Sequence, residues 1–187
     1  MIGFAFCGSF CSFERTFSVL AQLKNRGFDV LPIMSEIAYS TDTRFGKADE
    51  WRTRISALCG REIVHTIVGA EPLGPKIPLD ALVICPCTGN TLSKLASGMT
   101  DTAVCMAAKA HLRCDRPLII ALASNDAMSA NLGNIAAMLK RKNVYFVPMK
   151  QDDPVSKPHS LVADFEQAPE ALTAALNGIQ LRPLFLE

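Results

Sequence analysis

The chain has 187 residues, of which 19 are basic and 18 acidic, and 49% are hydrophobic. This length is enough to bury a sizeable core, so we expect one domain over residues 1–187. The net charge of +1 and the lack of a basic stripe argue against nucleic acid or an anionic membrane as the main partner. No apolar segment approaches the ~20 residues that span a bilayer.

Seven cysteines are present, and Met1 leads directly into an apolar run without a preceding basic segment. We therefore expect no signal peptide, a cytoplasmic location and reduced cysteines that mostly pack as small core residues. Cys85 and Cys87 would share one face of a strand. A C-x-C pair alone is not a zinc-site pattern, so no metal site is predicted.

The first elements form a βαβ unit. Apolar runs predict buried strands over residues 2–7 and 28–34, and a helical pattern covers about 14–24 and ends at Gly27. A strand, a tight glycine turn, a helix and a second strand are expected to cross over right-handed into a parallel sheet.

Gly8 and Ser9 lie in the turn between the first strand and the first helix. The spacing fits neither the G-x-x-x-x-G-K-[ST] phosphate loop nor the G-x-G-x-x-G dinucleotide fingerprint, although Glu36 resembles the ribose-binding acid of the latter. We expect free backbone N–H groups and a hydroxyl at this helix N-terminus, which would suit a single phosphate. A glycine that merely makes a tight turn is the alternative.

A polar segment over 35–47 is predicted to be irregular, and a helix is expected from Asp49 to Leu58. Arg44 lies in the polar segment, past the end of a strand, where loops of this architecture carry function. Its guanidinium is suited to binding a carboxylate, and a solvated surface arginine is the alternative.

Residues 63–68 fit either a strand or a short helix, because periodicity does not decide at this length. His65 lies among apolar residues there, where a histidine is more often packed than catalytic. Glycines and prolines predict an irregular loop over 69–79, with Lys76 near its end.

The stretch from Asp80 to Gly98 is the centre of the sequence. Residues 81–85 predict a strand buried on both faces and broken by Pro86, and polar residues 88–91 precede a helical spacing that starts at Leu92. A buried strand, a polar turn and a helix N-terminus are the usual place where an α/β sheet holds a ligand.

The second half repeats the alternation of strands and helices. Strands are expected over 117–122 and 144–147, and helices over 99–112, over 130–141 and up to Leu176, with Pro169 in the first turn of the last one. Prolines predict an arm without regular structure over 148–160. The fold class is therefore α/β, a doubly wound parallel sheet with helices on both faces.

Two motifs in this sequence resemble a known family. PCTGNT at 86–91, followed by KLASGMTD at 94–101, resembles the P-x-S-A-N-T segment of the homo-oligomeric flavin-containing cysteine decarboxylases, a flavoprotein superfamily that includes flavin prenyltransferases. The loops resemble the B-subunit family of dipicolinate synthases from spore-forming bacteria over nearly the full length. They are TDTRFG at 41–46, AEPLGPK at 70–76, SND at 124–126 and QDDP at 151–154.

The resemblance implies FMN bound in a Rossmann-like subunit that assembles as a trimer or dodecamer, with the flavin near a subunit interface. Matching positions imply that the phosphate is bound in the first turn, by Gly8, Ser9 and Phe10, and that Ser35 lies beside the flavin after the second strand. After the central strand, the phosphate and the ring would be lined by Thr88, Gly89, Asn90 and Thr91. Ser124 and Asn125 would close the site from the next strand.

The resemblance also implies a function. Together with the separate A subunit of a dipicolinate synthase, the chain would oxidise dihydrodipicolinate to dipicolinate in the mother cell of a sporulating bacterium, with NADP⁺ bound mostly by that partner. A small diacid substrate needs two cationic anchors, for which Arg44 and Lys76 are the candidates, with Asn90 as an orienting donor.

Departures from the superfamily pattern keep two alternatives open. Thr88 and Gly89 replace a serine and an alanine, and the segment from Ser35 to Arg52 lacks the active-site histidine expected there in a decarboxylase. The first alternative is a stand-alone FMN-dependent decarboxylase or flavin prenyltransferase, although no basic cluster for a prenyl phosphate is evident. The second is a non-catalytic subunit that holds flavin or a metabolite.

Overall fold

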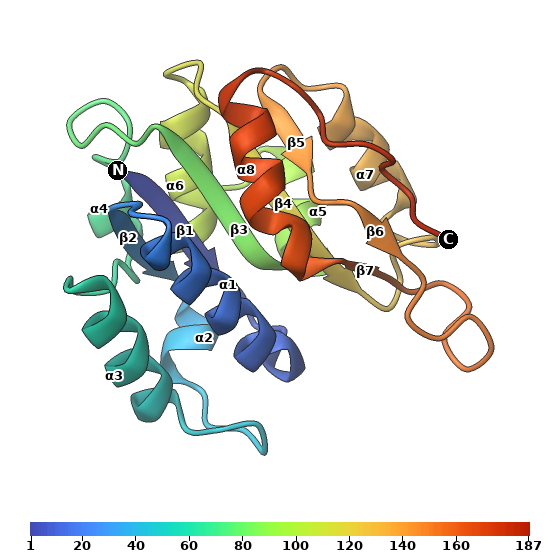
Figure 1. The fold of residues 1–187 in the computed structure, drawn as a ribbon, viewed down its shortest axis with the longest axis horizontal. Helices are drawn as coiled ribbons and strands as arrows, with labels where there is room; N and C mark the ends of the chain where they lie inside the picture. The colour runs from blue at the N-terminus through green and yellow to red at the C-terminus, as the bar shows by residue number, and fades with distance from the viewer.

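A seven-stranded sheet forms the centre of the computed structural model, which describes residues 1–187 (Figure 1). Five strands run parallel, with β5 pairing beside β4 at the end of the order β2-β1-β3-β4. Their bounds are β1 (Ile2–Phe6), β2 (Val30–Met34), β3 (Ala81–Thr88), β4 (Leu118–Ser124) and β5 (Val144–Phe146). The chain changes direction across the sheet between β1 and β3, so a crevice is expected at their carboxyl ends.

Helices cover both faces of the sheet, as the alternation of elements predicted. One face is covered by α1 (Phe13–Asn25), α3 (Ala48–Cys59) and α8 (Ala168–Leu176). The other is covered by α4 (Ile67–Ala70), α5 (Gly89–Ser97), α6 (Ala103–Leu112) and α7 (Leu132–Leu139). Figure 1 shows α1 and α8 in front of the sheet and α5 and α6 behind it. Because alternate strand residues point to opposite faces, the sheet supplies two separate cores.

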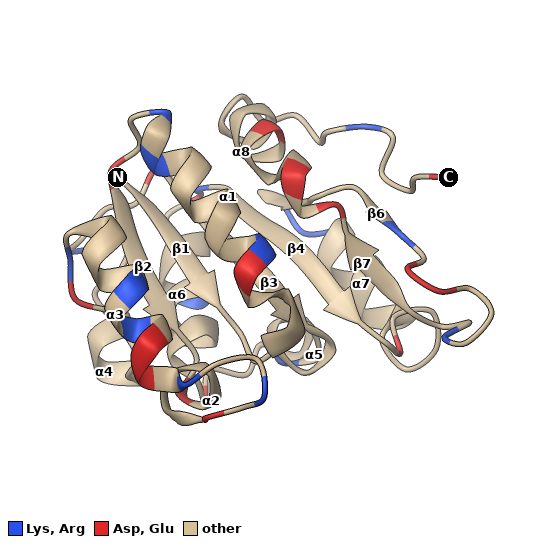
Figure 2. Cartoon of the chain, turned by 60° about the horizontal axis from the view of Figure 1, so that its bottom comes forward, with Lys and Arg blue, Asp and Glu red and all other residues tan.

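Aromatic side chains fill the core beneath α1 and α3. Phe13 of α1 is fully buried and meets Phe6 of β1 and Trp51 of α3 in edge-on contacts, with ring centroids 5.7 Å and 5.3 Å apart. Charged residues of both signs lie on the outer faces of these helices (Figure 2). There Arg54 of α3 donates to both carboxylate oxygens of Glu14 of α1, at 2.7 Å and 3.0 Å.

Most expected elements are confirmed to within two residues, and the central strand is the main correction. Pro86 does not end β3, which continues to Thr88. The register between β3 and β4 shifts between Ile84 and Cys87, on either side of the proline. Proline lacks an N–H group, so a strand tolerates it where the regular ladder is interrupted. The carboxyl end of β3 therefore lies farther along the chain than predicted.

Two helix boundaries also differ from the prediction. The polar segment 35–47 is not wholly irregular, because α2 (Glu36–Ser40) begins directly after Ser35, which caps it. The helix expected over 99–112 begins only at Ala103. Gly98 ends α5 with a positive φ of 73°, and the Thr102 hydroxyl accepts a hydrogen bond from the Cys105 N–H as the N-cap of α6.

The remaining differences concern short elements. Residues 63–68 combine both alternatives, because Val64 forms a parallel bridge with Ile33 and α4 starts three residues later. The arm over 148–160 contributes β6 (Met149–Lys150), which pairs with β7 (Leu161–Ala163), and β7 pairs antiparallel with β4. Two short antiparallel strands thus extend the parallel sheet. None of the helices combines the length and the apolar character needed to cross a lipid bilayer.

The buried aromatic contacts make Phe13 a test of the core. Replacing it by alanine removes a large side chain and leaves a cavity, so we expect Phe13→Ala to lower the free energy of unfolding by about 3–5 kcal/mol. Val68→Ala, at an 80% exposed position, should change it by less than about 0.5 kcal/mol. Urea denaturation followed by circular dichroism measures both, and equal midpoints would contradict the packing described.

Candidate functional site

A polar cavity of about 260 Å³ lies at the carboxyl ends of β1, β2 and β3. This is the point where the order of the strands reverses, the usual ligand position in such sheets. Loops from all three strands and the start of α6 supply its lining. The lining residues are Gly8, Ser35, Glu36, Ile37, Thr88, Asn90, Thr91, Lys94 and Thr102.

The loop after β1 presents hydrogen-bond donors near this cavity, with one correction. The N–H group of Ser9 is not free, because it donates to the carbonyl oxygen of Cys7 at 2.8 Å. The N–H groups of Gly8, Phe10 and Cys11 have no acceptor within the chain. Together with the Ser9 hydroxyl they form a donor set that suits an anion, at the start of a short 3-10 helix (Phe10–Ser12) that leads into α1.

The two residues after β2, Ser35 and Glu36, contact the N-termini of two helices beside the cavity. Ser35 is 9% exposed, and its hydroxyl accepts a hydrogen bond from the Ala38 N–H at 3.3 Å. The next residue, Glu36, accepts from the Ala103 N–H, the first residue of α6, at 3.0 Å. A carboxylate at a helix N-terminus is favoured by the helix dipole, so Glu36 holds α2 against α6.

The loop after β3 is a capped helix start. The Thr88 hydroxyl accepts from the Thr91 N–H at 3.2 Å and donates to the Thr91 hydroxyl at 3.1 Å. Because the Thr88 hydroxyl caps α5, it fixes the turn between β3 and this helix. The Asn90 side chain is exposed and makes no hydrogen bond within the chain, so its amide is free to contact a ligand.

Lys94 is a cationic lining residue that the sequence did not single out. Its ammonium group lies 2.9 Å from the Asp101 carboxylate. The hydrogen bond with Asp101 raises the pKa of Lys94, and the bond with Lys94 lowers the pKa of Asp101. The pair closes the loop between α5 and α6, and the Asp101 carboxylate compensates the charge of Lys94.

The loop after β4 is built around a carboxylate. Ser124 and Asn131 both donate to one oxygen of Asp126, the amide at 3.0 Å, and Asn134 donates to Asn131 at 2.9 Å. The Ser124 hydroxyl, followed by the Asn131 amide, lowers the pKa of Asp126. Ser124 and Asn125 do not line the cavity, but Ser124 packs directly against Gly89, another predicted site residue.

This carboxylate cluster explains the glycine at position 89. A Cβ atom there would collide with the Ser124 hydroxyl and would lie 2.6 Å from the Asn131 amide nitrogen and 2.9 Å from Asp126. Real Cβ atoms do not come so close to their neighbours. Gly89 is therefore the residue that lets the cluster pack directly behind the start of α5.

The two predicted substrate anchors lie apart. Arg44 is exposed in the loop after α2, with its guanidinium 4.8 Å from the centre of the Phe45 ring. Lys76 is exposed in the loop before β3, which ends where the Asp80 N–H donates to the carbonyl oxygen of Met1. That is the amino edge of the sheet, so the structure places Lys76 opposite the cavity.

His65 lies outside the cavity as well. Its ring stacks on Tyr39 with centroids 3.7 Å apart, and Nδ1 lies 3.2 Å from the carbonyl oxygen of Ile63. These contacts fit the packed position that we expected for this side chain. Four lining residues were not among the predicted site residues, namely Glu36, Ile37, Lys94 and Thr102. Lys94 and Asp101 nevertheless are the first and last residues of one motif of the resemblance.

Residues 1–173 match the family described as Flavoprotein. Over 186 residues the chain is 45% identical to the B subunit of dipicolinate synthase from Bacillus subtilis, covering 100% of this chain and 93% of that protein. The chain belongs to the flavoprotein family. The crystal structure of the dipicolinate synthase B subunit from Bacillus halodurans is 42% identical, with a TM-score of 0.91 over 100% of this chain and 95% of that one.

A more distant flavoprotein shares only the fold. The crystal structure of the FMN-dependent cysteine decarboxylase SpaF matches with a TM-score of 0.69 over 95% of each chain, at 24% identity. The comparisons confirm the resemblance to the B-subunit family and the Rossmann-like α/β fold predicted from the sequence. The roles of the individual site residues stay predictions.

The crowding around Gly89 gives a direct test of the site. Gly89→Ala should lower the free energy of unfolding by about 1–3 kcal/mol, because the added methyl group displaces the Asp126 cluster. Gly133→Ala is the matched control, since a Cβ there meets nothing within 4 Å and lies in α7. The control should leave stability unchanged or raise it by up to about 1 kcal/mol. Similar urea midpoints for both variants would contradict the cluster geometry.

Proposed function

We propose that this flavoprotein is the FMN-binding B subunit of a dipicolinate synthase. With a separate A subunit it would oxidise dihydrodipicolinate to dipicolinate, in the cytoplasm of the mother cell of a sporulating bacterium. The observation that carries the proposal is the polar cavity at the strand-order reversal, in a chain 45% identical to the B subunit of a dipicolinate synthase. The whole chain would act as one flavoprotein-like domain.

The residues of the cavity fit FMN, which carries a single phosphate. Gly8, Ser9 and Phe10 would bind this phosphate through the unpaired N–H groups of Gly8 and Phe10 and the hydroxyl of Ser9, in the turn before α1. Thr88, Gly89, Asn90 and Thr91 would line the phosphate and the ring, with Ser35 beside the flavin. When bound, FMN supplies a group that accepts a hydride.

An oligomer would complete the flavin site. The cavity of about 260 Å³ is smaller than the roughly 300–1,000 Å³ typical of pockets that enclose a cofactor-sized ligand. Part of the flavin would therefore lie beyond the cavity of one chain, where Ser124, Asn125 and a neighbouring protomer would cover it. A trimer, or a dodecamer built from trimers, is the proposed assembly.

The chain's own residues would bind and orient the substrate. Oxidation of dihydrodipicolinate removes a hydride and a proton and makes the ring aromatic, which supplies driving force. Asn90 would orient the ring through its free amide. The overall acceptor would be NADP⁺, bound mostly by the A subunit.

Arg44 would clamp one carboxylate of the diacid with its planar guanidinium. Lys76 was predicted as the second anchor, but it lies at the amino edge of the sheet. Lys76 would therefore reach a substrate only in the cavity of a neighbouring protomer.

Flavin binding is the first test of this function. The purified chain should take up FMN with a shift in its visible absorbance, and Asn90→Ala should weaken binding about fivefold by removing one hydrogen bond. Asn177→Ala, at the far end of α8, is the matched control and should bind like the wild type. A colourless chain that takes up no FMN on titration would contradict the flavin site and favour a non-catalytic binding subunit.

Turnover by the two-subunit enzyme is the second test. Arg44→Ala should raise the KM for dihydrodipicolinate by about tenfold with little change in kcat, because one charge-assisted anchor is lost. Arg26→Ala, which removes an exposed arginine paired with Glu170, should leave both constants unchanged. Unaltered kinetics of Arg44→Ala would remove this residue from the site. Activity of the lone chain on an acyl-cysteine or on dimethylallyl phosphate would contradict the proposed function.

A further inference from the structure

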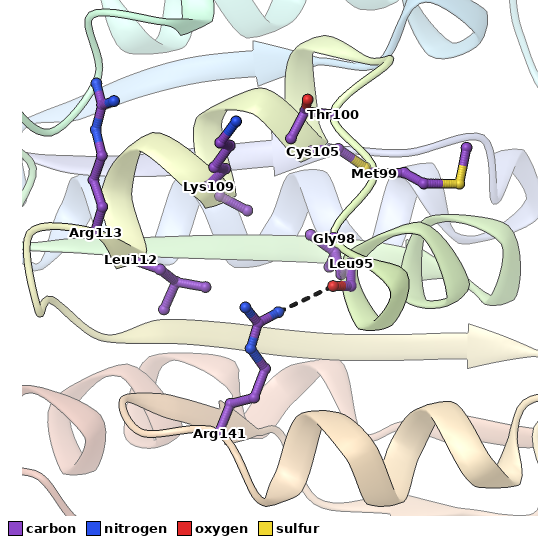
Figure 3. A pocket seen from close by; sticks show the side chains of 10 residues that line it. Leu95, Gly98, Met99, Thr100, Cys105, Lys109, Leu112, Arg113 and Arg141 are labelled. Atoms are coloured by element: carbon purple, nitrogen blue, oxygen red, sulfur yellow. Dashed lines mark hydrogen bonds between the residues drawn. The ribbon is translucent and has the colours of Figure 1, made fainter.

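A second cavity, of about 390 Å³, lies between α5, α6 and the residues that follow α7 (Figure 3). Its lining is apolar apart from three cationic side chains and a threonine. The apolar residues are Leu95, Met99, Cys105, Ala108 and Leu112, and the cations are Lys109, Arg113 and Arg141. Its size falls within the roughly 300–1,000 Å³ range of small-molecule sites.

The three cations have no acidic partner. None of Lys109, Arg113 and Arg141 takes part in any of the chain's ion pairs, and no aspartate or glutamate lines the cavity. Three exposed cations without an ion-pair partner thus line one cavity in a chain whose net charge is only +1, and Figure 3 shows Arg113 directed away from Arg141. Such a concentration favours an anionic ligand.

The guanidinium of Arg141 is held in place by a hydrogen bond to α5. Its Nη1 donates to the carbonyl oxygen of Leu95, in the last turn of α5, at 3.0 Å, and lies 3.8 Å from the sulfur of Met138. Figure 3 shows the guanidinium reaching across to Leu95, with Leu112 beside it. Because one nitrogen is anchored, the other donors of the guanidinium are preorganised for a carboxylate.

We propose that this cavity binds a small dicarboxylate with a flat apolar body. The cations would bind the carboxylates and the five apolar side chains would cover the body. An inorganic anion would leave the apolar lining unused, and an uncharged ligand would make no contact with the charges of the three exposed cations. The proposal rests on the proposed function, because this is the chemical class of dipicolinate.

The two cavities are separate sites. They share no lining residue, and the connection from Gly98 to Thr102 lies between them. Consecutive residues of α5 divide between them, since Lys94 lines the polar cavity and Leu95 lines the apolar one. The dicarboxylate would therefore bind without displacing the flavin.

Isothermal titration calorimetry of the full chain with pyridine-2,6-dicarboxylate tests the proposal. The wild type should bind the diacid, and Arg141→Gln and Lys109→Gln should each weaken binding about tenfold or more. The matched control is Lys142→Gln, next to Arg141 in sequence but paired with Asp115 and exposed, and it should bind like the wild type. Thermal unfolding of each variant without ligand shows that it is folded, and pyridine-2-carboxylate should bind more weakly than the diacid.

Several outcomes would overturn the proposal. They are an undetectable affinity of the wild type at millimolar diacid, equal affinities of wild type, Arg141→Gln and Lys109→Gln, and loss of binding when the chain is saturated with FMN. A changed assembly state in Arg141→Gln, measured by light scattering, would instead assign the cavity to an interface between protomers. If FMN uptake and two-subunit turnover persist without this binding, only the second site fails. If turnover is absent while Arg141-dependent binding is present, the proposed function fails and the site stands.

Discussion

The capping of helix N-termini at the carboxyl edge of the sheet is the constraint on which the site depends. Ser35, Thr88 and Thr102 each begin a helix by accepting a backbone N–H, and the Glu36 carboxylate accepts a further N–H from α6. Each cap fixes one loop, and together they line the polar cavity. Since one cap satisfies only part of a helix terminus, the remaining N–H groups stay available to an anion. The residues that stabilise this edge therefore also line the cavity for which a ligand is proposed.

Much of the fold follows from local patterns in the sequence. Buried parallel strands are continuous apolar runs, and glycine and hydroxyl residues mark the ends of helices, so most boundaries were predicted closely. The errors arise where tertiary contacts decide. Pro86 looked like a strand end, but the register shift beside β4 lets β3 continue. The strand pair β6–β7 is too short to leave an alternating pattern in the sequence.

The site was predicted in part for the same reason. Gly8, Ser35 and Asn90 follow different strands and meet because parallel strands end at one edge, which the topology alone implies. Glu36 and Lys94 form hydrogen bonds with residues 67 and 7 positions away in sequence, and no local sequence pattern predicts such contacts. The prediction for Lys76 failed for a different reason, because the sequence near a lysine does not show at which edge of the sheet its loop lies.

Gly89, which stands where the superfamily motif has alanine, shows how neighbouring side chains pack into the space of a missing methyl group. Loss of a methyl group at position 89 makes room for a carboxylate held by Ser124 and Asn131, directly behind the turn that Thr88 caps. The cluster packs the residues that follow β4 against the start of α5. Helix α5 then separates two environments, since residues one position apart lie about 100° apart around a helix. Lys94 accordingly faces the polar cavity while Leu95 lines the apolar one. One helix thus forms a common wall between the polar cavity and the cationic apolar cavity, so the two ligands proposed for them would contact different residues of one chain.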